Sequence, residues 1–389
     1  LEDVARANKL ICNIDLVTDN SLTTAERAQY KAEAKIFRAM VMFDMVRLWG
    51  DFPVITTVAD DITSENIDEV YPQYFPKQNT ELEAYQQIEK DLLDAVLYAP
   101  DNTPGNKTLF SKSVARTLLA KIYAEKPLRD YTKVIQYCDE VKADGFDLVD
   151  DFSDLFGMNA AGTDAKMRNT KESILEAQFT SGAGNWCTWM FGRDLVNWNN
   201  NFTWAKWVTP SRDLISAFKQ EGDEVRFKES IVYYDCNWSN YYPSDNYPFM
   251  YKCRSANSSI IKYRYADVLL LKAEALIMQD TPDLEGAADI IDEVRDRAKL
   301  GALPTSVRSN KNVLLNALLK ERRLELAFEG QRWFDLVRLD KVEEVMNAVY
   351  AKDSGRKAQI YTFDKNSYRL PIPQSVIDAN DKIHQNPGY

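Results

Sequence analysis

Six of the eight tryptophans fall within one segment of the sequence, where asparagines are interleaved with them. A sugar ring has a flat apolar face edged by hydroxyl groups, so a glycan site needs aromatic platforms and hydrogen-bonding side chains around them. Large aromatic side chains also build the core of a loop-rich segment, but six exceed what a segment of weak helical periodicity needs for packing. We therefore expect at least two of them to face a glycan. The candidates are Trp186, Trp189, Trp198, Trp204, Trp207 and Trp238, with Asn185 at the rim.

A cluster of acids and bases near the C-terminal end suggests a second kind of chemistry. Carboxylate pairs flanked by arginines are common in glycosidase sites. On one long helix, however, acids and bases spaced three or four residues apart form ion pairs along a face. We therefore favour a structural role for this cluster. Its members are Glu321, Arg322, Arg323, Glu325, Glu329, Arg332, Asp335 and Arg338.

Other catalytic and metal-binding patterns have little support. His384 is the only histidine and lies near the end of the chain, so a Ser-His-Asp or Cys-His triad is not favoured. The five cysteines form no CxxC pair, and we expect free thiols rather than a disulfide between Cys236 and Cys253. We expect no cofactor, with a structural or ligand-bridging calcium ion left open.

The formal net charge of -11 at pH 7 limits the class of ligand. Nucleic acid is a poor partner for such a chain, because phosphate binding requires clustered Lys and Arg. A neutral ligand fits better than a strongly anionic polymer, unless a local basic pocket overrides the global field. No apolar run reaches the roughly 18 residues of a membrane-spanning helix. The chain begins at Leu1 rather than at Met, and we expect a leader to precede it.

Helical patterns and an internal repeat surround the aromatic segment. Capping boxes at Thr23 and Thr80, each with a Glu three residues later, predict helices that end before Gly50 and Pro100. A first helix with small residues beside Leu pairs, followed by an amphipathic second helix, occurs twice and resembles tetratricopeptide units. The two pairs are 114–124 with 131–141, and 265–275 with 284–294.

Two further patterns concern the ends and the middle of the chain. Residues 43–48 match residues 334–339, and each is expected to close a long helix. Between the repeats the composition changes to Trp, Tyr, Asn, Gly and Ser, which predicts a loop-rich insertion. Within it we expect a strand over 174–179 and, over 209–218, a turn followed by a helix with Pro210 just inside the helix start.

Four motifs, in the same order and over almost the full chain, resemble the SusD-like (SusD/RagB) family of outer-membrane binding proteins. They are RLWGDFP at 47–53, YRYADVLL at 263–270, ERRLELAFEGQRWFD at 321–335, and a closing motif with LPIPQS at 370–375 and QNPGY at 385–389. The resemblance implies a scaffold of tetratricopeptide-like helix pairs and a SusC-like TonB-dependent transporter as partner. It also implies a lipid-anchored location on the outside of the cell outer membrane.

Two expectations about position follow from that resemblance. The signal peptide and the lipidated cysteine should precede Leu1, so Cys12, which lies in a helical pattern, is not the anchor. Ligand surfaces in the family draw on the insertion and on the loop after Trp49, where Tyr71 and Tyr74 lie.

The combined prediction is a mainly α fold. A single SusD-like domain spans 1–389, with a helical-repeat scaffold at 1–145 and 260–389 and an aromatic-rich insertion at 146–259. The predicted function is non-catalytic binding of an oligo- or polysaccharide and its delivery to the transporter. A peptide- or protein-binding tetratricopeptide-like scaffold is the alternative, and a helical-barrel glycoside hydrolase ranks last.

Overall fold

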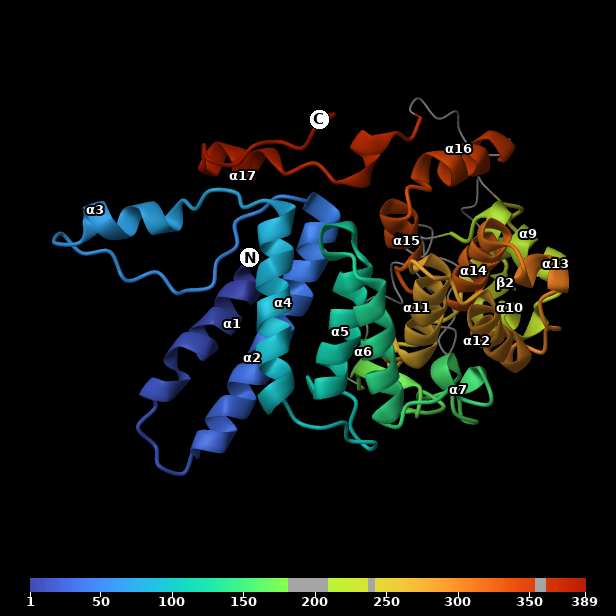
Figure 1. Cartoon of the computed structure of the whole chain (residues 1–389), viewed down its shortest axis with the longest axis horizontal. Helices are drawn as coiled ribbons and strands as arrows, with labels where there is room; N and C mark the ends of the chain where they lie inside the picture. Colours follow the sequence, from blue (N-terminus) through green and yellow to red (C-terminus); the bar gives the residue numbers. More distant parts are fainter. Residues whose placement is uncertain (181–208, 237–241, 354–361) are drawn as a thin grey trace. The chain divides into compact units, whose positions relative to one another are not determined.

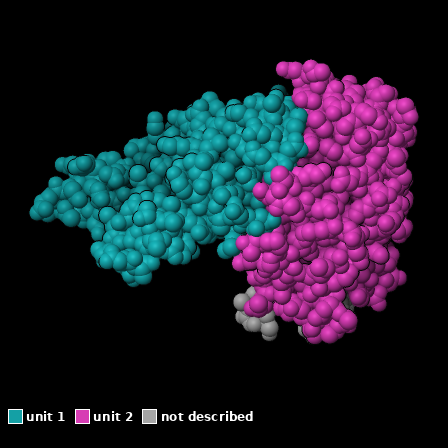
Figure 2. Space-filling model, turned by 60° about the horizontal axis from the view of Figure 1, so that its bottom comes forward, with its two compact units in different colours: residues 1–102, 109–140, 363–389 teal, residues 103–108, 141–362 magenta. Residues whose placement is uncertain are grey.

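The computed structural model describes residues 1–180, 209–236, 242–353 and 362–389 (Figure 1). Helices dominate these residues, as the sequence predicted, and the strands are short. The chain contacts form two compact units, coloured separately in Figure 2. Unit 1 contains residues 1–102, 109–140 and 363–389, and unit 2 contains residues 103–108 and 141–362. The single-domain division into scaffold and insertion stays a prediction.

Unit 1 is built from helices. Its elements are α1 (Glu2–Asn13), η1 (Ile14–Leu16), α2 (Thr24–Trp49), α3 (Ile67–Val70), η2 (Tyr71–Tyr74), α4 (Glu81–Tyr98), α5 (Lys112–Ala124), η3 (Lys126–Leu128), α6 (Tyr131–Ala143), η6 (Lys365–Tyr368) and α17 (Gln374–Ala379). Helix α6 begins in unit 1, and its last residues belong to unit 2. The rings of Tyr123 on α5 and Tyr137 on α6 stack with their centroids 5.9 Å apart.

The two predicted capping boxes set the start of the longest helices of unit 1. The hydroxyls of Thr23 and Thr80 accept hydrogen bonds from the backbone N–H groups three residues later, which confirms both predictions. Helices α2 and α4 pack side by side (Figure 1). Phe43 of α2 meets Tyr85 of α4 edge to face, with the ring centroids 6.2 Å apart.

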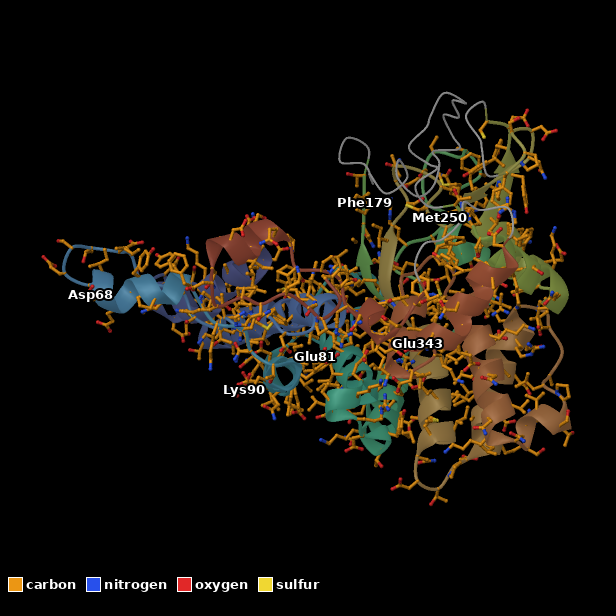
Figure 3. All side chains as sticks on the ribbon, turned by 90° about the horizontal axis from the view of Figure 1, so that it is seen from above. Asp68, Glu81, Lys90, Phe179, Met250 and Glu343 are labelled. Atoms are coloured by element: carbon orange, nitrogen blue, oxygen red, sulfur yellow. The ribbon has the colours of Figure 1, made fainter. Side chains whose placement is uncertain are left out.

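The closing motif binds back to the first motif within unit 1. The backbone N–H of Leu370 donates to the carbonyl of Leu48 at 2.7 Å, and Asn386 Nδ2 donates to the carbonyl of Trp49 at 2.9 Å. Arg369 pairs with Glu81 at the start of α4, while Lys90 lies further along the same helix (Figure 3). The two motifs are therefore one structural joint that satisfies the free carbonyls at the end of α2.

Unit 2 combines helices with two antiparallel strand pairs, β1 with β4 and β2 with β3. Its elements are α7 (Ser153–Phe156), β1 (Ser173–Ala177), α9 (Arg212–Glu221), α10 (Glu224–Ser230), β2 (Ile231–Tyr234), β3 (Tyr247–Met250), β4 (Ile260–Arg264), α11 (Tyr265–Met278), α12 (Leu284–Arg297), α13 (Thr305–Arg308), α14 (Lys311–Glu325), α15 (Arg332–Arg338) and α16 (Val342–Lys352). Strand β1 confirms the predicted strand. Helix α11 packs against α12 and α14, which confirms the predicted second helix pair and adds a third partner.

Two predictions about unit 2 are wrong in detail. Within 209–218 the expected helix is present and begins at Arg212, because the Ser211 side chain caps it, so Pro210 precedes the helix instead of lying inside its start. The acid-base cluster does not lie on one long helix. Helix α14 ends at Glu325 and α15 begins at Arg332, and between them Phe328 has a φ of 66° and Gly330 a φ of 75°, which an α-helix does not allow. The FDLVRL motif at 334–339 therefore closes a short helix.

Candidate functional site

Seven of the nine predicted ligand-binding residues fall in parts of the chain that the structure does not describe. Trp186, Trp189, Trp198, Trp204, Trp207, Trp238 and Asn185 lie outside the described residues. Tyr71 and Tyr74 are described, in η2 of unit 1, and are 52% and 49% exposed. The Tyr74 hydroxyl donates to the carbonyl of Asp60 at 2.9 Å, and the Tyr71 ring packs against Phe75 with centroids 4.8 Å apart. Both side chains are held in place with much of their surface open to solvent.

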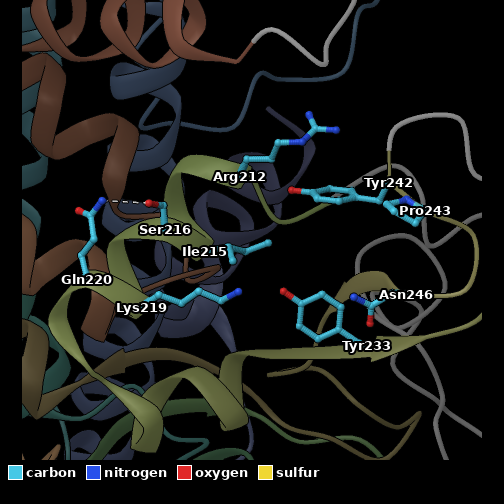
Figure 4. Close-up of a pocket in the computed structure, with 9 residues that line it drawn as sticks. All are labelled: Arg212, Ile215, Ser216, Lys219, Gln220, Tyr233, Tyr242, Pro243 and Asn246. Atoms are coloured by element: carbon cyan, nitrogen blue, oxygen red, sulfur yellow. Dashed lines mark hydrogen bonds between the residues drawn. The ribbon is translucent and has the colours of Figure 1, made fainter.

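A pocket of about 450 Å³ in unit 2 brings together aromatic, amide and basic side chains (Figure 4). Pockets of this size fall within the range that takes small organic ligands. One wall is helix α9, and the other comes from β2 and from the turn that leads into β3. The lining residues are Arg212, Ile215, Ser216, Lys219, Gln220, Tyr233, Tyr242, Pro243 and Asn246.

The sequence of α9 explains how it presents its polar face to this pocket. The Ser211 hydroxyl accepts a hydrogen bond from the backbone N–H of Leu214 at 3.1 Å, and Gly222 ends the helix in the left-handed conformation. Leu214 and Phe218 are buried in an apolar cluster with Ile231 of β2. With that face fixed, Ser216, Lys219 and Gln220 lie on the face that lines the pocket.

The two tyrosines of the opposite wall are held by different contacts. The Tyr242 hydroxyl donates to the carbonyl of Pro210 at 2.8 Å, and its ring meets Tyr247 edge to face with centroids 5.7 Å apart. Tyr233 packs against Phe227, and burial raises the pKa of its hydroxyl above the ordinary value. Tyr233 is therefore a neutral phenol at physiological pH, able to donate or accept one hydrogen bond at the pocket.

Arg212 connects the two walls of the pocket. Its guanidinium lies 4.6 Å from the centre of the Tyr242 ring and donates from Nη1 to Asp353 Oδ1 at 2.8 Å. Figure 4 shows the Tyr242 ring beside Arg212, with the Lys219 and Tyr233 side chains extending toward each other across the pocket. The arrangement offers flat aromatic surface with amide and cationic donors around it, which suits a sugar ring.

Two other cavities lie on unit 1 and differ in chemistry. The larger, of about 720 Å³, lies along α2 and α4 and has no aromatic side chain among its lining residues. Its charged residues pair with one another, as Arg38 does with Asp91 at 2.7 Å and Lys35 with Asp94. The other, of about 320 Å³, is lined mostly by small and charged residues, with Tyr98 as its one aromatic side chain. We therefore take the pocket of Figure 4 as the candidate site.

The acid-base cluster forms a buried ion-pair network instead of a cleft. Glu325, fully buried, pairs with Arg226 at 3.0 Å, with Arg264 at 2.5 Å and with Arg297. Burial alone would raise its pKa, but these arginines hold the pKa of the Glu325 carboxyl well below its usual range. It is therefore a permanent anion with cations on several sides, and not a proton donor for catalysis.

Most other members of the cluster are also paired with residues of opposite charge. Arg322 pairs with both Asp267 and Asp335 at 2.8 Å, and Glu329 pairs with Arg264 at 2.7 Å and with Lys252 at 2.6 Å. The prediction that these residues form ion pairs is confirmed for the cluster except Arg332, which donates from Nη1 to the carbonyl of Leu319 at 2.9 Å. The pairs differ from the expected ones, since most connect different elements in the interior instead of running along one helix face.

Metal and membrane features can be stated for the described part of the chain. There, no group of three or more His, Cys, Asp and Glu side chains could hold a metal ion. No helix in the same residues is long and apolar enough to cross a membrane. Cys236 is a buried free thiol, so it forms no disulfide with Cys253, as predicted.

The sequence reasoning missed the residues of the pocket. Tyrosines are frequent in the chain, with 20 in total, so Tyr233 and Tyr242 did not stand out beside the clustered tryptophans. The amphipathic pattern of residues 212–221 was a usable signal. Its polar face carries the two cations Arg212 and Lys219, and Asp213 is the one carboxylate between them in the sequence. Nothing local, however, indicated which strand would face that helix.

Two family models match the chain at its two ends. The model described as "SusD family" matches residues 245–389, and the model described as "Starch-binding associating with outer membrane" matches residues 2–124. These ranges contain all four motifs on which the resemblance was based.

Individual relatives match nearly the whole chain. SusD-like protein P2 of Formosa agariphila is 28% identical over 99% of this chain and 78% of its own length. The starch-binding protein SusD of Bacteroides thetaiotaomicron is 24% identical over 97% of this chain and 76% of its own length. The structure of surface glycan-binding protein A from Bacteroides thetaiotaomicron, in complex with laminarihexaose, shares the fold, with a TM-score of 0.75 at 20% identity over 98% of this chain and 83% of that chain. These matches confirm the resemblance: the chain is similar to SusD-like proteins along nearly its whole length, and models of that family match both of its ends.

Proposed function

We propose that this protein binds an oligo- or polysaccharide at the cell surface, without altering it, and delivers it to a SusC-like TonB-dependent transporter. The observation that carries the proposal is the pocket of Figure 4, where two tyrosines and a polar rim lie on a scaffold similar to that of SusD-like proteins. Tyr233 and Tyr242 supply the stacking surface, and Gln220 and Asn246 supply amide groups for sugar hydroxyls.

The proposal includes parts that rest on the similarity to SusD-like proteins. We place the protein on the outer face of the outer membrane, held by a lipid on a cysteine that precedes Leu1. We keep as further glycan-binding residues those that the sequence predicted, which are Tyr71, Tyr74, Asn185 and the tryptophans at 186, 189, 198, 204, 207 and 238. Binding needs no cofactor, and the alternative of a bridging calcium ion is distinguished by repeating the titration with a chelator.

The proposal that the protein does not cleave its glycan agrees with the buried ion-pair network around Glu325. A glycosidase needs two carboxyl groups about 5 to 10 Å apart across a sugar-sized cleft, one of them with a raised pKa. Among the described residues, those that line the pocket include no carboxylate, and Glu325 and Glu329 are buried anions paired with arginine or lysine. The described site therefore has the groups for recognition and not for glycoside cleavage.

Calorimetric titration against a panel of oligosaccharides tests the proposal. We expect at least one glycan to bind, and Tyr233→Ala to weaken that binding about tenfold, which corresponds to about 1.4 kcal/mol. Tyr233→Phe keeps the ring and should lose only a few-fold, because a single hydrogen bond contributes about 1 kcal/mol.

The matched control removes an exposed tyrosine of unit 1 that lines none of the described cavities, Tyr30→Ala, and should leave the affinity unchanged. Mass spectrometry of the recovered glycan should show no cleavage. If no glycan in the panel binds, or if cleavage products accumulate, the proposed function is wrong.

A further inference from the structure

The pocket of Figure 4 has a charge that differs from that of the whole chain. The protein carries a formal net charge of -11, yet the nine described residues that line this pocket include two cations and no carboxylate. Clefts lined by one sign of charge concentrate ligands of the opposite sign. The local field at the pocket therefore attracts an anion, against the trend of the molecule as a whole.

Lys219 is the cation of the pocket for which no described residue serves as a counterion. No ion pair joins its ammonium group to any described residue, and the side chain is exposed. The acidic residues nearest to it on α9 are already engaged: Asp213 pairs with Arg323 at 2.6 Å, and Glu221 pairs with Arg295 at 2.7 Å.

A solvated lysine in the last turn of a helix is common, since it interacts favourably with the helix dipole. Lys219 differs from that ordinary case because its side chain reaches over the pocket toward Tyr233 (Figure 4). The hydroxyl of Tyr233 makes no hydrogen bond to a described residue either, and burial keeps it protonated. A cation and a neutral phenol therefore face the same space, each with hydrogen-bonding capacity for a ligand.

Arg212 adds a second cation in a fixed position. Asp353, with a side chain only 10% exposed, balances part of its charge and holds it over the Tyr242 ring. The guanidinium therefore needs little reordering when a ligand enters, which favours binding. Asp245, beside the rim residue Asn246, is exposed and does not line the pocket, so solvent screens its repulsion of an anion.

The other lining residues identify what carries the anion. Tyr233, Tyr242, Ile215 and Pro243 present apolar surface, which a bare inorganic anion does not use. Ser216, Gln220 and Asn246 add neutral hydrogen-bonding groups of the kind that match hydroxyls. A sugar ring with one negatively charged substituent uses all three kinds of surface.

We propose, resting on the proposed glycan-binding function, that this pocket is a subsite for a sugar unit that carries an anionic substituent, with Lys219 as the main determinant of its charge selectivity. The substituent is a carboxylate, as in a uronic acid, or a sulfate ester. Both are recognised by the same ammonium and guanidinium groups, so the structure assigns the class, and the experiment separates the two members.

The test is calorimetric titration of the purified chain with three sets of oligosaccharides: oligogalacturonates, sulfated galactan oligomers, and neutral glucan and galactan oligomers of equal length. We expect one anionic set to bind more tightly than the neutral sets. Lys219→Gln should weaken that binding about fivefold, or about 1 kcal/mol, and Lys219→Glu should weaken it further through repulsion. Raising the salt concentration should weaken the anionic set more than the neutral ones.

Controls separate this inference from general effects of charge. Lys219→Arg keeps the charge and should retain most of the affinity. Lys228→Gln makes the same change in net charge at a residue of α10 that does not line the pocket, and should have no effect. The set that loses affinity in Lys219→Gln identifies the substituent as carboxylate or sulfate.

The outcomes distinguish the two proposals. If neutral oligosaccharides bind as tightly as both anionic sets, or if Lys219→Gln and Lys228→Gln behave alike, the anionic subsite is wrong while glycan binding stands. If none of the three sets binds, the proposed function fails together with the subsite.

Discussion

Unit 2 holds cationic side chains in two contrasting settings. In one they are buried and paired with carboxylates, and in the other a lysine is exposed and pairs with no described residue. Around Glu325 the cations Arg226, Arg264 and Arg297 lie in the interior, and each pairs with at least two carboxylates. In the pocket beside α9, Lys219 is exposed and pairs with no described residue. The first set belongs to the scaffold, and the second is available to something outside the chain.

The difference follows from the cost of removing a charge from water. A buried ion is tolerated only when partners replace its hydration, so removing one partner exposes the full penalty for those that remain. An exposed lysine keeps its hydration, and its missing partner costs nothing until a ligand arrives. Changes in the network should therefore affect stability, whereas changes in the pocket should affect affinity.

The largest effect is expected from Glu325→Gln. The change leaves Arg226, Arg264 and Arg297 without their shared anion in the interior, and breaking a buried pair typically costs about 3 to 5 kcal/mol. Urea unfolding followed by circular dichroism measures the loss. If the variant still folds, its affinity for the glycan should change far less than its stability.

A matched change on the surface shows whether burial is the cause. Glu285 pairs with Arg308 at 2.5 Å, but its side chain is 72% exposed. Glu285→Gln should cost less than about 1 kcal/mol. Equal losses in the two variants would contradict the distinction between the network and the surface.

The second prediction concerns Lys252, whose buried ammonium pairs with Glu329 at 2.6 Å. Burial lowers its pKa from 10.5 to about 8. Between these values the unfolded chain binds more protons at this position than the folded chain, so the free energy of unfolding rises with pH. Relative to Lys252→Met, the native protein should therefore gain up to about 3 kcal/mol between about pH 8 and pH 10.5.

Urea unfolding of both proteins at pH 7, 8, 9 and 10 measures this gain as a growing difference. A constant or shrinking difference for Lys252→Met would show that the network does not perturb this lysine.

Local patterns in the sequence predicted the parts of the fold that local physics determines. The capping boxes at Thr23 and Thr80 set the starts of α2 and α4, because the cap and the residue it bonds are three apart. The break between α14 and α15 was missed, since Phe328 adopts a positive φ that its residue type does not favour. Its position is fixed by packing against an apolar cluster, which no pattern within the helix reveals.

The network and the pocket were harder to predict for the same reason. Glu325 was identified as an ion-pairing residue, but its partners Arg226 and Arg264 come from elements distant in the sequence. The pocket likewise needs α9, β2 and the turn before β3 to meet. The composition of the sequence led to a site prediction at the clustered tryptophans. Tyr233 and Lys219 can be recognised as site residues only from the residues that face them in the structure.

The smallest effect is expected from the residues that cap two helices, one in the pocket and one in the ion-pair network. They also give the most sensitive test of the comparison between the two settings. The Ser211 hydroxyl caps α9, which carries the pocket, and the Asn310 side chain caps α14, which carries Glu325. Replacing either by Ala should cost about 1 kcal/mol of stability. Only Ser211→Ala should also weaken glycan binding, by a few-fold, because fraying the first turn of α9 loosens Arg212. Titration and urea unfolding of both variants measure this, and a similar loss of affinity in Asn310→Ala would mean that binding follows overall stability instead of the geometry of α9.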